Sequence, residues 1–254
     1  MKAMIFAAGL GTRLKPLTDT MPKALVPLCG KPLIYHVMRK LVSSGFDEIV
    51  VNVHHFADMI EDYLWSVQGL GAKVSISDER DMLRETGGGI MHARKFLEAT
   101  PGGFLVHNVD IISDLDLRGF VSQCSPDALA TLLVSERKTS RYLLFDSQMR
   151  LVGWTNISTG EVRTPYPDLD VAACRRLAFS GIHYMSTGIF SAMEDVLGNG
   201  TGAFPECFPI MDFYLKASAA YPIYGIEAKG LHLVDVGKMQ SLHEAETLCS
   251  GFLI

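Results

Sequence analysis

The sequence predicts an α/β fold, in which a Rossmann-like, doubly wound mixed sheet carries a β-rich cap. Three observations support this prediction. Short apolar runs alternate with helical patterns through the first half of the chain, which is typical of parallel strands joined by crossover helices. Glycine-rich loops follow two of the predicted strands. The second half instead contains several short runs of strand character, which favours an additional β-rich layer.

The first half of the chain alternates between strand and helix patterns. Apolar runs typical of buried strands cover residues 3–8, 47–53 and 104–107, and residues 72–77 alternate between apolar and polar as a strand does. Apolar residues at helical spacing follow three of these strands, over residues 32–45, 56–67 and 90–98. The first of these helices has proline in its first turn and glycine at its end, as many helices do. The resulting order, β-α-β-α-β-α-β, implies right-handed crossovers and a parallel arrangement of these strands.

The second half has a different pattern, with more strands than helices. Strands are predicted at residues 128–134, 142–145, 177–184, 221–226 and 231–234. Helices are predicted at 205–217 and 238–249, and residues 155–176 are expected to be irregular. We therefore expect a single domain over residues 1–254, made of a first half (1–125) and a second half (126–254). The sequence has no hexapeptide array, so we expect no left-handed β-helix domain.

Composition and charge restrict the class of protein. A chain of 254 residues with 48% apolar and 20% charged residues is ordinary for a globular protein. Its net charge of −5 argues against a protein that binds nucleic acid. The five cysteines are scattered, which favours reduced thiols over a zinc site or a disulfide framework. Because the sequence shows no signal-peptide pattern and no run of membrane-spanning length, we expect a cytoplasmic protein without membrane contact.

The loop after the first strand is the strongest candidate for chemistry. It contains Gly9 and Gly11, then Thr12 and Arg13, and ends ten residues later at Lys23. Glycines at a strand end let backbone N–H groups converge around an anion, because no side chain intervenes. Arg13 and Lys23 would add positive charge that suits a polyanion better than a single phosphate. The alternative is an ordinary glycine turn, which is common after the first strand of α/β proteins.

Two carboxylates, Asp110 and Asp235, each come directly after a predicted strand. Ligands of doubly wound sheets bind beyond the carboxyl ends of the strands, so we expect the first loop, residues 85–89 and Asp110 to meet in one crevice. The strand before Asp235 would return beside Asp110. A pair of carboxylates that leaves other positions to water is a common Mg²⁺ site beside substrate phosphates. The alternative role of each aspartate is to cap the following segment.

The run ETGGGI at residues 85–90 is the second candidate loop. Glu85 and Thr86 supply groups that recognise hydroxyls, and the glycines after them leave the backbone bare, which suits a sugar. The alternative is that the three glycines are only a loose start of the next helix.

The first loop resembles the signature of the sugar-1-phosphate nucleotidyltransferase family. This signature, a strand followed by Gly-Thr-Arg, Pro-Leu-Thr and a later Pro-Lys, is present as AAGLGTRLKPLT…PK. The resemblance extends over nearly the whole chain. Within the family, the N-acetylmuramate-1-phosphate uridylyltransferases are the more similar group. The shorter matches to that group are ETGGGI at 85–90, NVD at 108–110, FSGI at 179–182, DVG at 235–237 and EAE at 244–246.

The resemblance implies the nucleotide-diphospho-sugar transferase fold and a Mg²⁺-dependent enzyme of nucleotide-sugar biosynthesis. Its substrates would be a nucleoside triphosphate, UTP in the first place, and a sugar 1-phosphate, such as N-acetylmuramate 1-phosphate or a related amino sugar. An oxygen of the sugar phosphate would attack the α-phosphorus in line, giving an NDP-sugar and pyrophosphate. The first half would bind the nucleotide and the second half the sugar phosphate, in a monomer or homodimer that serves cell-wall synthesis.

The roles of family residues can be assigned to matching positions of this chain. Arg13 and Lys23 would be catalytic, because they neutralise the triphosphate and the charge that develops at its α-phosphate. Asp110 and Asp235 would bind the metal. The sugar-binding residues would be Glu85, Thr86 and Gly181. The nucleotide-binding residues would be Ala8, Gly9, Gly11, Thr12, Arg13, Lys23, Gly87 and Gly88.

The chain departs from the family pattern in three places. Val109 stands where many relatives have glycine before the aspartate, and Lys238–Met239 follow the DVG triplet. The Glu-Lys-Pro segment that supplies a sugar-phosphate lysine is absent, and Arg175, Arg176 or a basic residue within 137–141 would have to replace it. Two alternatives to uridylyl transfer stay open. One is a guanylyl-, thymidylyl- or cytidylyltransferase for another sugar or alcohol phosphate, and the other is a regulator that binds nucleotide sugars without catalysis.

Overall fold

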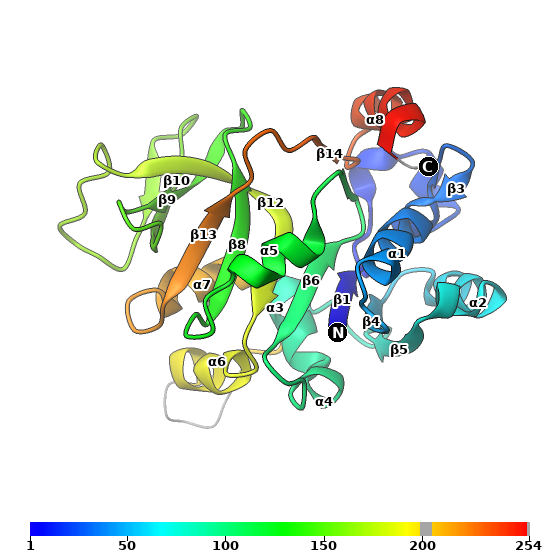
Figure 1. Ribbon diagram of the computed structural model, residues 1–254, viewed down its shortest axis with the longest axis horizontal. Coiled ribbons are helices and arrows are strands. Elements are labelled where there is room, and N and C mark those ends of the chain that lie inside the picture. The colour runs from blue at the N-terminus through cyan, green and yellow to red at the C-terminus, as the bar shows by residue number, and fades with distance from the viewer. Residues whose placement is uncertain (199–204, 253–254) are drawn as a thin grey trace. The chain divides into compact units, whose positions relative to one another are not determined.

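The computed structural model describes residues 1–198 and 205–252 (Figure 1). The fold is mixed α/β with a central mixed sheet, as predicted. The chain divides into two compact units. Unit 1 comprises Met1–Leu83, Val106–Gly119 and Leu231–Ile254, and unit 2 comprises Arg84–Leu105 and Phe120–Gly230. The predicted single domain with halves 1–125 and 126–254 stays a prediction.

Unit 1 contains parallel strands in the order β6-β1-β4-β5. Their bounds are β1 (Lys2–Phe6), β4 (Glu48–Val53), β5 (Lys73–Asp78) and β6 (Phe104–Asn108), of which β6 begins in unit 2. Strand β1 pairs in parallel with β4, and β4 pairs in parallel with β5. Strands β1, β4 and β6 are apolar and mostly buried, as expected where both faces of a sheet are covered, whereas the edge strand β5 alternates apolar and polar residues and is mostly half-buried. The predicted strands of the first half are thus confirmed.

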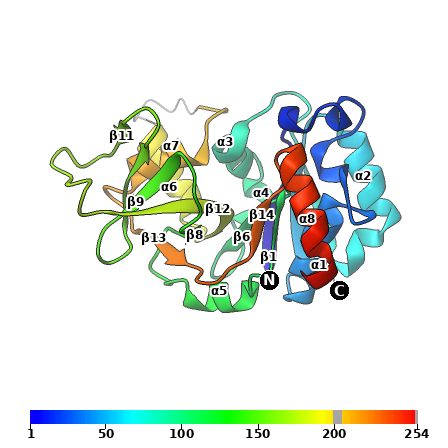
Figure 2. The same ribbon diagram turned by 90° about the horizontal axis from the view of Figure 1, so that it is seen from above.

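Helices connect and cover the strands of unit 1. They are α1 (Leu33–Ser43), α2 (Ala57–Ser66) and α8 (Met239–Phe252). Two short antiparallel pairs complete the unit, β2 (Pro27–Leu28) with β3 (Lys31–Pro32) and β7 (Ile111–Ser113) with β14 (Leu233–Asp235). Helix α8 contacts β14 and β2 (Figure 2). Cys29, between β2 and β3, is disulfide-bonded, so the prediction that the cysteines are reduced is wrong for this residue.

Unit 2 is built mainly from antiparallel strands. They are β8 (Ala130–Ser135), β9 (Arg141–Phe145), β10 (Leu151–Asn156), β11 (Glu161–Arg163), β12 (Arg175–Met185) and β13 (Ile223–Glu227). The long strand β12 pairs antiparallel with both β8 and β9, and β13 adds in parallel to β8. Strand β10 joins β9 to β11. The predicted β-rich character of the second half is confirmed.

The remaining helices include the clearest differences from the prediction. They are α3 (Glu85–His92), α4 (Arg94–Leu97), α5 (Leu117–Gln123), α6 (Ile189–Leu197) and α7 (Ile210–Ala217). The three glycines at 87–89 lie inside α3, whereas they were expected before it. The helix predicted at 205–217 begins only at Ile210, and its predicted region borders residues 199–204, which lie outside the described part of the chain. Among the described residues, no helix has both the length and the apolar character needed to cross a membrane.

The stretch predicted to be irregular, residues 155–176, also contains strand. The end of β10 and all of β11 lie within it, and β12 begins at Arg175. Every residue of β11 is exposed, so this edge strand lacks the apolar alternation from which a strand is predicted. Its strand character comes from pairing with β10.

Candidate functional site

The two glycines of the loop after β1 have different structural roles. A side chain at Gly9 would meet no atom within 4 Å, and its backbone is not in the left-handed region. Gly11 has a φ of +65°, which favours glycine, and a Cβ there would lie 2.9 Å from Lys23 Cβ. The carbonyl of Gly11 accepts hydrogen bonds from the backbone N–H of Leu14 and from Thr18 Oγ1. Gly11 therefore holds the loop together, while Gly9 leaves open space.

The rest of the loop alternates between buried and exposed residues. Ala8 is 5% exposed at the end of the strand. Thr12 and Arg13 are exposed in a 3₁₀ turn, Thr12–Leu14, and a second turn covers Leu17–Asp19. Of the predicted nucleotide-binding residues of this loop, Gly9, Thr12 and Arg13 are therefore exposed, whereas Gly11 and Lys23 are half-buried and Ala8 is buried.

A buried polar pair anchors the start of the loop. The Asn52 side chain accepts a hydrogen bond from the Ala7 backbone N–H (2.8 Å) and donates one from Nδ2 to Glu79 Oε1 (2.8 Å). Glu79 is fully buried, and its backbone N–H donates to the Val53 carbonyl. The His54 ring donates from Nδ1 to the Glu79 carbonyl (2.7 Å). Local sequence pattern did not predict a role for Asn52 or Glu79, although an asparagine in the apolar run EIVVNV was a visible signal.

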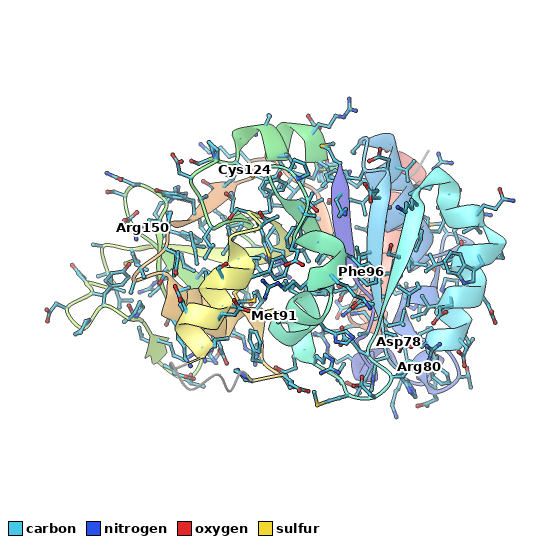
Figure 3. The ribbon with its side chains drawn as sticks, turned by 90° about the horizontal axis from the view of Figure 1, so that it is seen from below. Asp78, Arg80, Met91, Phe96, Cys124 and Arg150 are labelled. Atoms are coloured by element: carbon cyan, nitrogen blue, oxygen red, sulfur yellow. The ribbon has the colours of Figure 1, made fainter. Side chains whose placement is uncertain are left out.

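Ion pairs of Arg80 at the protein surface also restrain the loop that contains Glu79. Figure 3 shows Asp78 and Arg80 next to one another. Arg80 donates to Asp78 Oδ2 (2.5 Å), and its Nη2 donates to Asp58 (2.6 Å) and Glu61 (2.7 Å) on α2. Exposed ion pairs contribute little individually. Here one ion pair holds Arg80 to the end of β5 and two hold it to α2, which restricts the position of the loop.

Lys23 and Asp110 form an ion pair in unit 1. Their side chains are only 12% and 13% exposed. Lys23 begins the 3₁₀ turn Lys23–Leu25, and Asp110 lies in the two-residue turn between β6 and β7. The preceding residue, Val109, donates its N–H to the Phe6 carbonyl (3.2 Å) without adopting a positive φ, so this turn does not require glycine. The departure from the family pattern at Val109 is therefore compatible with the local backbone.

The second predicted metal ligand lies beside the first. In the antiparallel pair β7–β14, Asp235 is opposite Ile111, and the Val236 N–H donates to the Asp110 carbonyl (2.8 Å). Asp110 and Asp235 therefore come from adjacent backbone segments. In the part of the chain that the structure describes, no group of three or more His, Cys, Asp and Glu residues is arranged to hold a metal. A set of two carboxylates still fits Mg²⁺, because this ion keeps several waters and binds substrate phosphates.

Arg13 approaches the same place as Asp235. A Cβ on Gly237 would lie 2.7 Å from Arg13 Nη2 and 2.7 Å from Asp235 Oδ1. The glycine of the DVG triplet thus lets the guanidinium group and the carboxylate approach one another. Unit 1 consequently brings together the charged residues predicted for catalysis and for metal binding.

His107 lies in β6, close to this group of charges, and carries none itself at neutral pH. Burial lowers the pKa of His107 to about 4, and the charge of Lys40 acts in the same direction. A hydrogen bond to the Asn108 carbonyl and the charge of Asp110 oppose the shift. His107 is therefore a buried, neutral residue of the core.

In unit 2, the glycines of α3 pack against a distant segment. The N–H groups of Gly87 and Gly88 both donate to the Phe208 carbonyl (2.8 and 3.2 Å), which satisfies donors in the first turn of the helix. A Cβ on Gly87 would lie 2.2 Å from the Phe208 ring, and one on Gly88 would lie 2.2 Å from the Glu206 carbonyl. Thr86 Oγ1 accepts the Ile210 N–H (2.9 Å). Close approach by residues 206–208 thus explains why glycines lie inside a helix, and their assignment to the nucleotide stays a prediction.

The other predicted sugar-binding residues have unusual backbone conformations. Glu85 is exposed and has a φ of +57°, which is uncommon for a residue with a side chain. Gly181 has a φ of +74° in β12, where the register to β8 shifts between Phe179 and His183. Such a bulge explains the glycine without a ligand. Their roles toward a sugar, and the meeting of both candidate loops in one crevice, stay predictions.

The basic residues considered in place of the missing lysine have different partners. Arg175 forms an ion pair with Glu227 (2.7 Å). Arg137 donates from Nη2 to the Phe179 carbonyl (3.3 Å), two residues before Gly181. Arg137 therefore lies close to the backbone segment that contains Gly181, although the two residues are far apart in the sequence.

Known proteins resemble this chain over its whole length. The sequence model of the nucleotidyl transferase family matches residues 2–250. The N-acetylmuramate alpha-1-phosphate uridylyltransferase of Neisseria meningitidis serogroup B is 45% identical over 254 residues, which are 99% of this chain and 100% of that protein. The protein of the same name from Caulobacter vibrioides is 49% identical over 112 residues, which are 43% of this chain and 46% of that protein.

A solved structure shares the fold. The crystal structure of HddC from Yersinia pseudotuberculosis is 25% identical and has a TM-score of 0.73, with 97% of this chain and 98% of that chain covered. At this level of identity we use the similarity for the fold alone.

Proposed function

The chain belongs to the nucleotidyl transferase family, as its first loop predicted, and we propose that it transfers the uridylyl group of UTP to N-acetylmuramate 1-phosphate. Its enzyme class is sugar-1-phosphate nucleotidyltransferase, in agreement with both uridylyltransferase relatives. The choice of substrates is supported by the Neisseria relative, because the match covers that protein from end to end.

One observation carries the proposal, the ion pair of Lys23 with Asp110 beside the loop in which Gly9 leaves open space. An NTP offers a polyanion, and the open backbone at Gly9 with the nearby cationic side chains suits its phosphates. The attacking oxygen belongs to a phosphate monoester, which is already an anion, so no general base is needed. Such a transfer depends on alignment of the two phosphate groups and on stabilisation of the negative charge that develops on them.

The roles of the unit 1 residues follow from their chemistry. Arg13 and Lys23 would neutralise the triphosphate and the negative charge that moves onto the leaving pyrophosphate. Ala8, Gly9, Gly11 and Thr12 would contact the nucleotide, with Gly9 supplying the closest backbone approach. Asp110 and Asp235 would hold Mg²⁺, which when bound neutralises charge on the phosphate oxygens.

The sugar and base would be recognised by residues of unit 2. Thr86 Oγ1 accepts a hydrogen bond from Ile210, so its own hydroxyl proton remains able to reach an acceptor on the substrate. Glu85 is exposed and able to accept from sugar hydroxyls. We assign Gly181 to the sugar, and Gly87 and Gly88 to the nucleotide. We place the enzyme in the cytoplasm, as a monomer or homodimer that makes a nucleotide sugar for cell-wall synthesis.

The test is a substrate panel. UTP, GTP, CTP and dTTP are each combined with N-acetylmuramate 1-phosphate, N-acetylglucosamine 1-phosphate, glucose 1-phosphate and mannose 1-phosphate, and Mg²⁺-dependent release of pyrophosphate is measured. We expect the highest kcat/KM for UTP with N-acetylmuramate 1-phosphate. A higher value for another pair would overturn the substrate assignment, and no release with any pair would support a non-catalytic protein.

A pair of variants tests the metal assignment. Asp110→Asn keeps the size of the side chain but removes its charge, so Mg²⁺-dependent turnover should fall by at least about 100-fold. The matched control is Asp114→Asn, because Asp114 lies four residues later and pairs with His232. The control should keep near-normal turnover. If Asp110→Asn also keeps it, Asp110 does not bind the metal.

A further inference from the structure

The ion pair between Lys23 and Asp110 joins a residue proposed to bind phosphate to a residue proposed to bind metal. We propose that Lys23 occupies the cation position on Asp110 until a divalent metal displaces it, so that metal binding releases the ammonium group to the triphosphate. This inference rests on the proposed function, because it takes Asp110 as a metal ligand. The proposed roles of Lys23 and Asp110 do not by themselves say which event comes first. The inference adds that the metal binds Asp110 before Lys23 reaches the triphosphate.

A metal and the lysine would compete because both bind the same carboxylate. The Lys23 Nζ contacts Asp110 Oδ2, and Mg²⁺ binds carboxylate oxygens at about 2.0–2.1 Å. Two cations on one carboxylate repel each other strongly, and this repulsion is little screened where both side chains are nearly buried. The divalent ion can therefore take its place on Asp110 only if the ammonium group moves away.

The loop is built so that the end of the lysine moves while its base stays. Gly11 lies against Lys23 Cβ, and any Cβ on this glycine would be only 2.9 Å away. The Gly11 carbonyl is held in turn by Leu14 and Thr18. The four-carbon stem of a lysine has enough rotatable bonds to swing its ammonium group from a carboxylate to a phosphate without backbone movement.

The pairing of cations with carboxylates also explains how the charged residues of the site are stable when no ligand is bound. Removing either member of a nearly buried ion pair leaves an uncompensated charge. Lys23 compensates Asp110, and Arg13 approaches Asp235 next to Gly237. When a metal–triphosphate complex arrives, the metal compensates the carboxylates and the phosphates compensate the cations.

Binding of Mn²⁺ alone, without nucleotide, tests the competition. Electron paramagnetic resonance of free Mn²⁺ measures its dissociation constant for the wild type and three variants. Lys23→Met removes the competing cation and should tighten Mn²⁺ binding on the order of ten-fold. Lys15→Met is the matched control, since Lys15 pairs with Asp19 in the same loop but with both side chains exposed (59% and 49%). It should leave the constant unchanged, and Asp110→Asn should lose the site.

The outcomes separate this inference from the proposed function. If Asp110→Asn loses Mn²⁺ but Lys23→Met binds it no more tightly than the wild type, the displacement is overturned and the metal assignment stands. If Asp110→Asn binds Mn²⁺ as the wild type does, the metal assignment itself is wrong and the inference falls with it. Tighter binding by both Lys23→Met and Lys15→Met would show only a general effect of lost charge, and would also overturn the displacement.

A second measurement uses the unaltered protein, in case Lys23→Met does not fold. The Nζ resonances of lysines labelled with ¹⁵N are recorded while Mg²⁺ is added without nucleotide. The proposal expects one nearly buried lysine, assigned to Lys23 by its absence in Lys23→Arg, to lose its ion-pair shift as Mg²⁺ binds. The Lys15 resonance should not move. A Lys23 resonance that stays unchanged at saturating Mg²⁺ would overturn the proposal.

Discussion

Asn52 and Glu79 form a hydrogen bond of 2.8 Å in the interior of unit 1. Asn52 is 2% exposed and Glu79 is fully buried. Through its side-chain oxygen, Asn52 also accepts the backbone N–H of Ala7, at the start of the loop proposed to bind the triphosphate. A carboxylate buried in this way is stable only while its hydrogen-bond donors are present. The pair therefore connects the interior of the sheet to the position of the first loop.

The first prediction concerns this pair. Asn52→Ala should lower the free energy of unfolding by about 2–4 kcal/mol, because it removes one hydrogen bond from the buried Glu79 side chain and another from the Ala7 N–H. Urea denaturation measures the change. The control is Asn156→Ala, whose side chain accepts the Ser158 N–H in an exposed turn and should cost less than about 1 kcal/mol. Equal losses for the two variants would contradict the role given to Asn52.

The second prediction separates a ligand-facing glycine from a structural one. Gly9→Ala should leave the free energy of unfolding within about 0.5 kcal/mol of the wild type, because the new methyl group meets open space. It should nevertheless weaken UTP binding, measured by isothermal titration calorimetry. Gly11→Ala should cost more than about 1 kcal/mol of stability, owing to its positive φ and the contact with Lys23. Normal UTP affinity in Gly9→Ala would show that the open space is not the nucleotide site.

The third prediction concerns the packing of α3. Gly87→Ala should destabilise unit 2 by about 2–4 kcal/mol, since its Cβ would lie 2.2 Å from the Phe208 ring. Adding Phe208→Ala should recover part of this loss, so the two changes are not additive in a double-mutant cycle. The control is Gly188→Ala, which adds only an ordinary contact of 3.4 Å with Ser186. Additive effects of Gly87→Ala and Phe208→Ala would argue against the contact.

The fourth prediction is a pH dependence of stability that comes from His107. Its pKa is about 4 in the folded protein, against an ordinary value of 6.5. The unfolded chain therefore takes up a proton as the pH falls below about 6.5, while folded His107 does so only near 4. Stability is unaffected by His107 above about pH 6.5 and decreases as the pH falls toward 4, on the order of 3 kcal/mol in total.

Urea denaturation at about pH 7.5 and about pH 4.5 measures this loss. His107→Leu should reduce the difference in stability between the two pH values, because the buried ring no longer has to stay neutral. His243→Leu is the control, since His243 is exposed on α8 and should leave the difference unchanged. An undiminished difference in His107→Leu would assign the acid sensitivity to other groups.

Much of the fold could be predicted because its strands and helices carry local patterns. Strands β1, β4 and β6 are largely apolar runs, β5 alternates apolar and polar residues, and α1 buries Leu33, Val37 and Leu41 at helical spacing. The prediction was wrong where pairing overrides local pattern. Strand β11 is exposed along its length and exists as the partner of β10. Helix α3 contains three glycines, which are poor helix formers, and residues 206–208 pack directly on the backbone at Gly87 and Gly88.

For the candidate site, the sequence by itself determined which residues were candidates and what chemistry each one offers. The glycines and cations of the first loop, and the aspartates that follow two strands, were all identifiable from motif and position, because backbone freedom and charge are properties of single residues. Only the tertiary structure decided how they act on one another. It pairs Lys23 with Asp110 across 87 positions, and it distinguishes Gly9, beside open space, from Gly11, which packs on Lys23. Such contacts depend on how the whole chain packs, and local sequence contains no record of them.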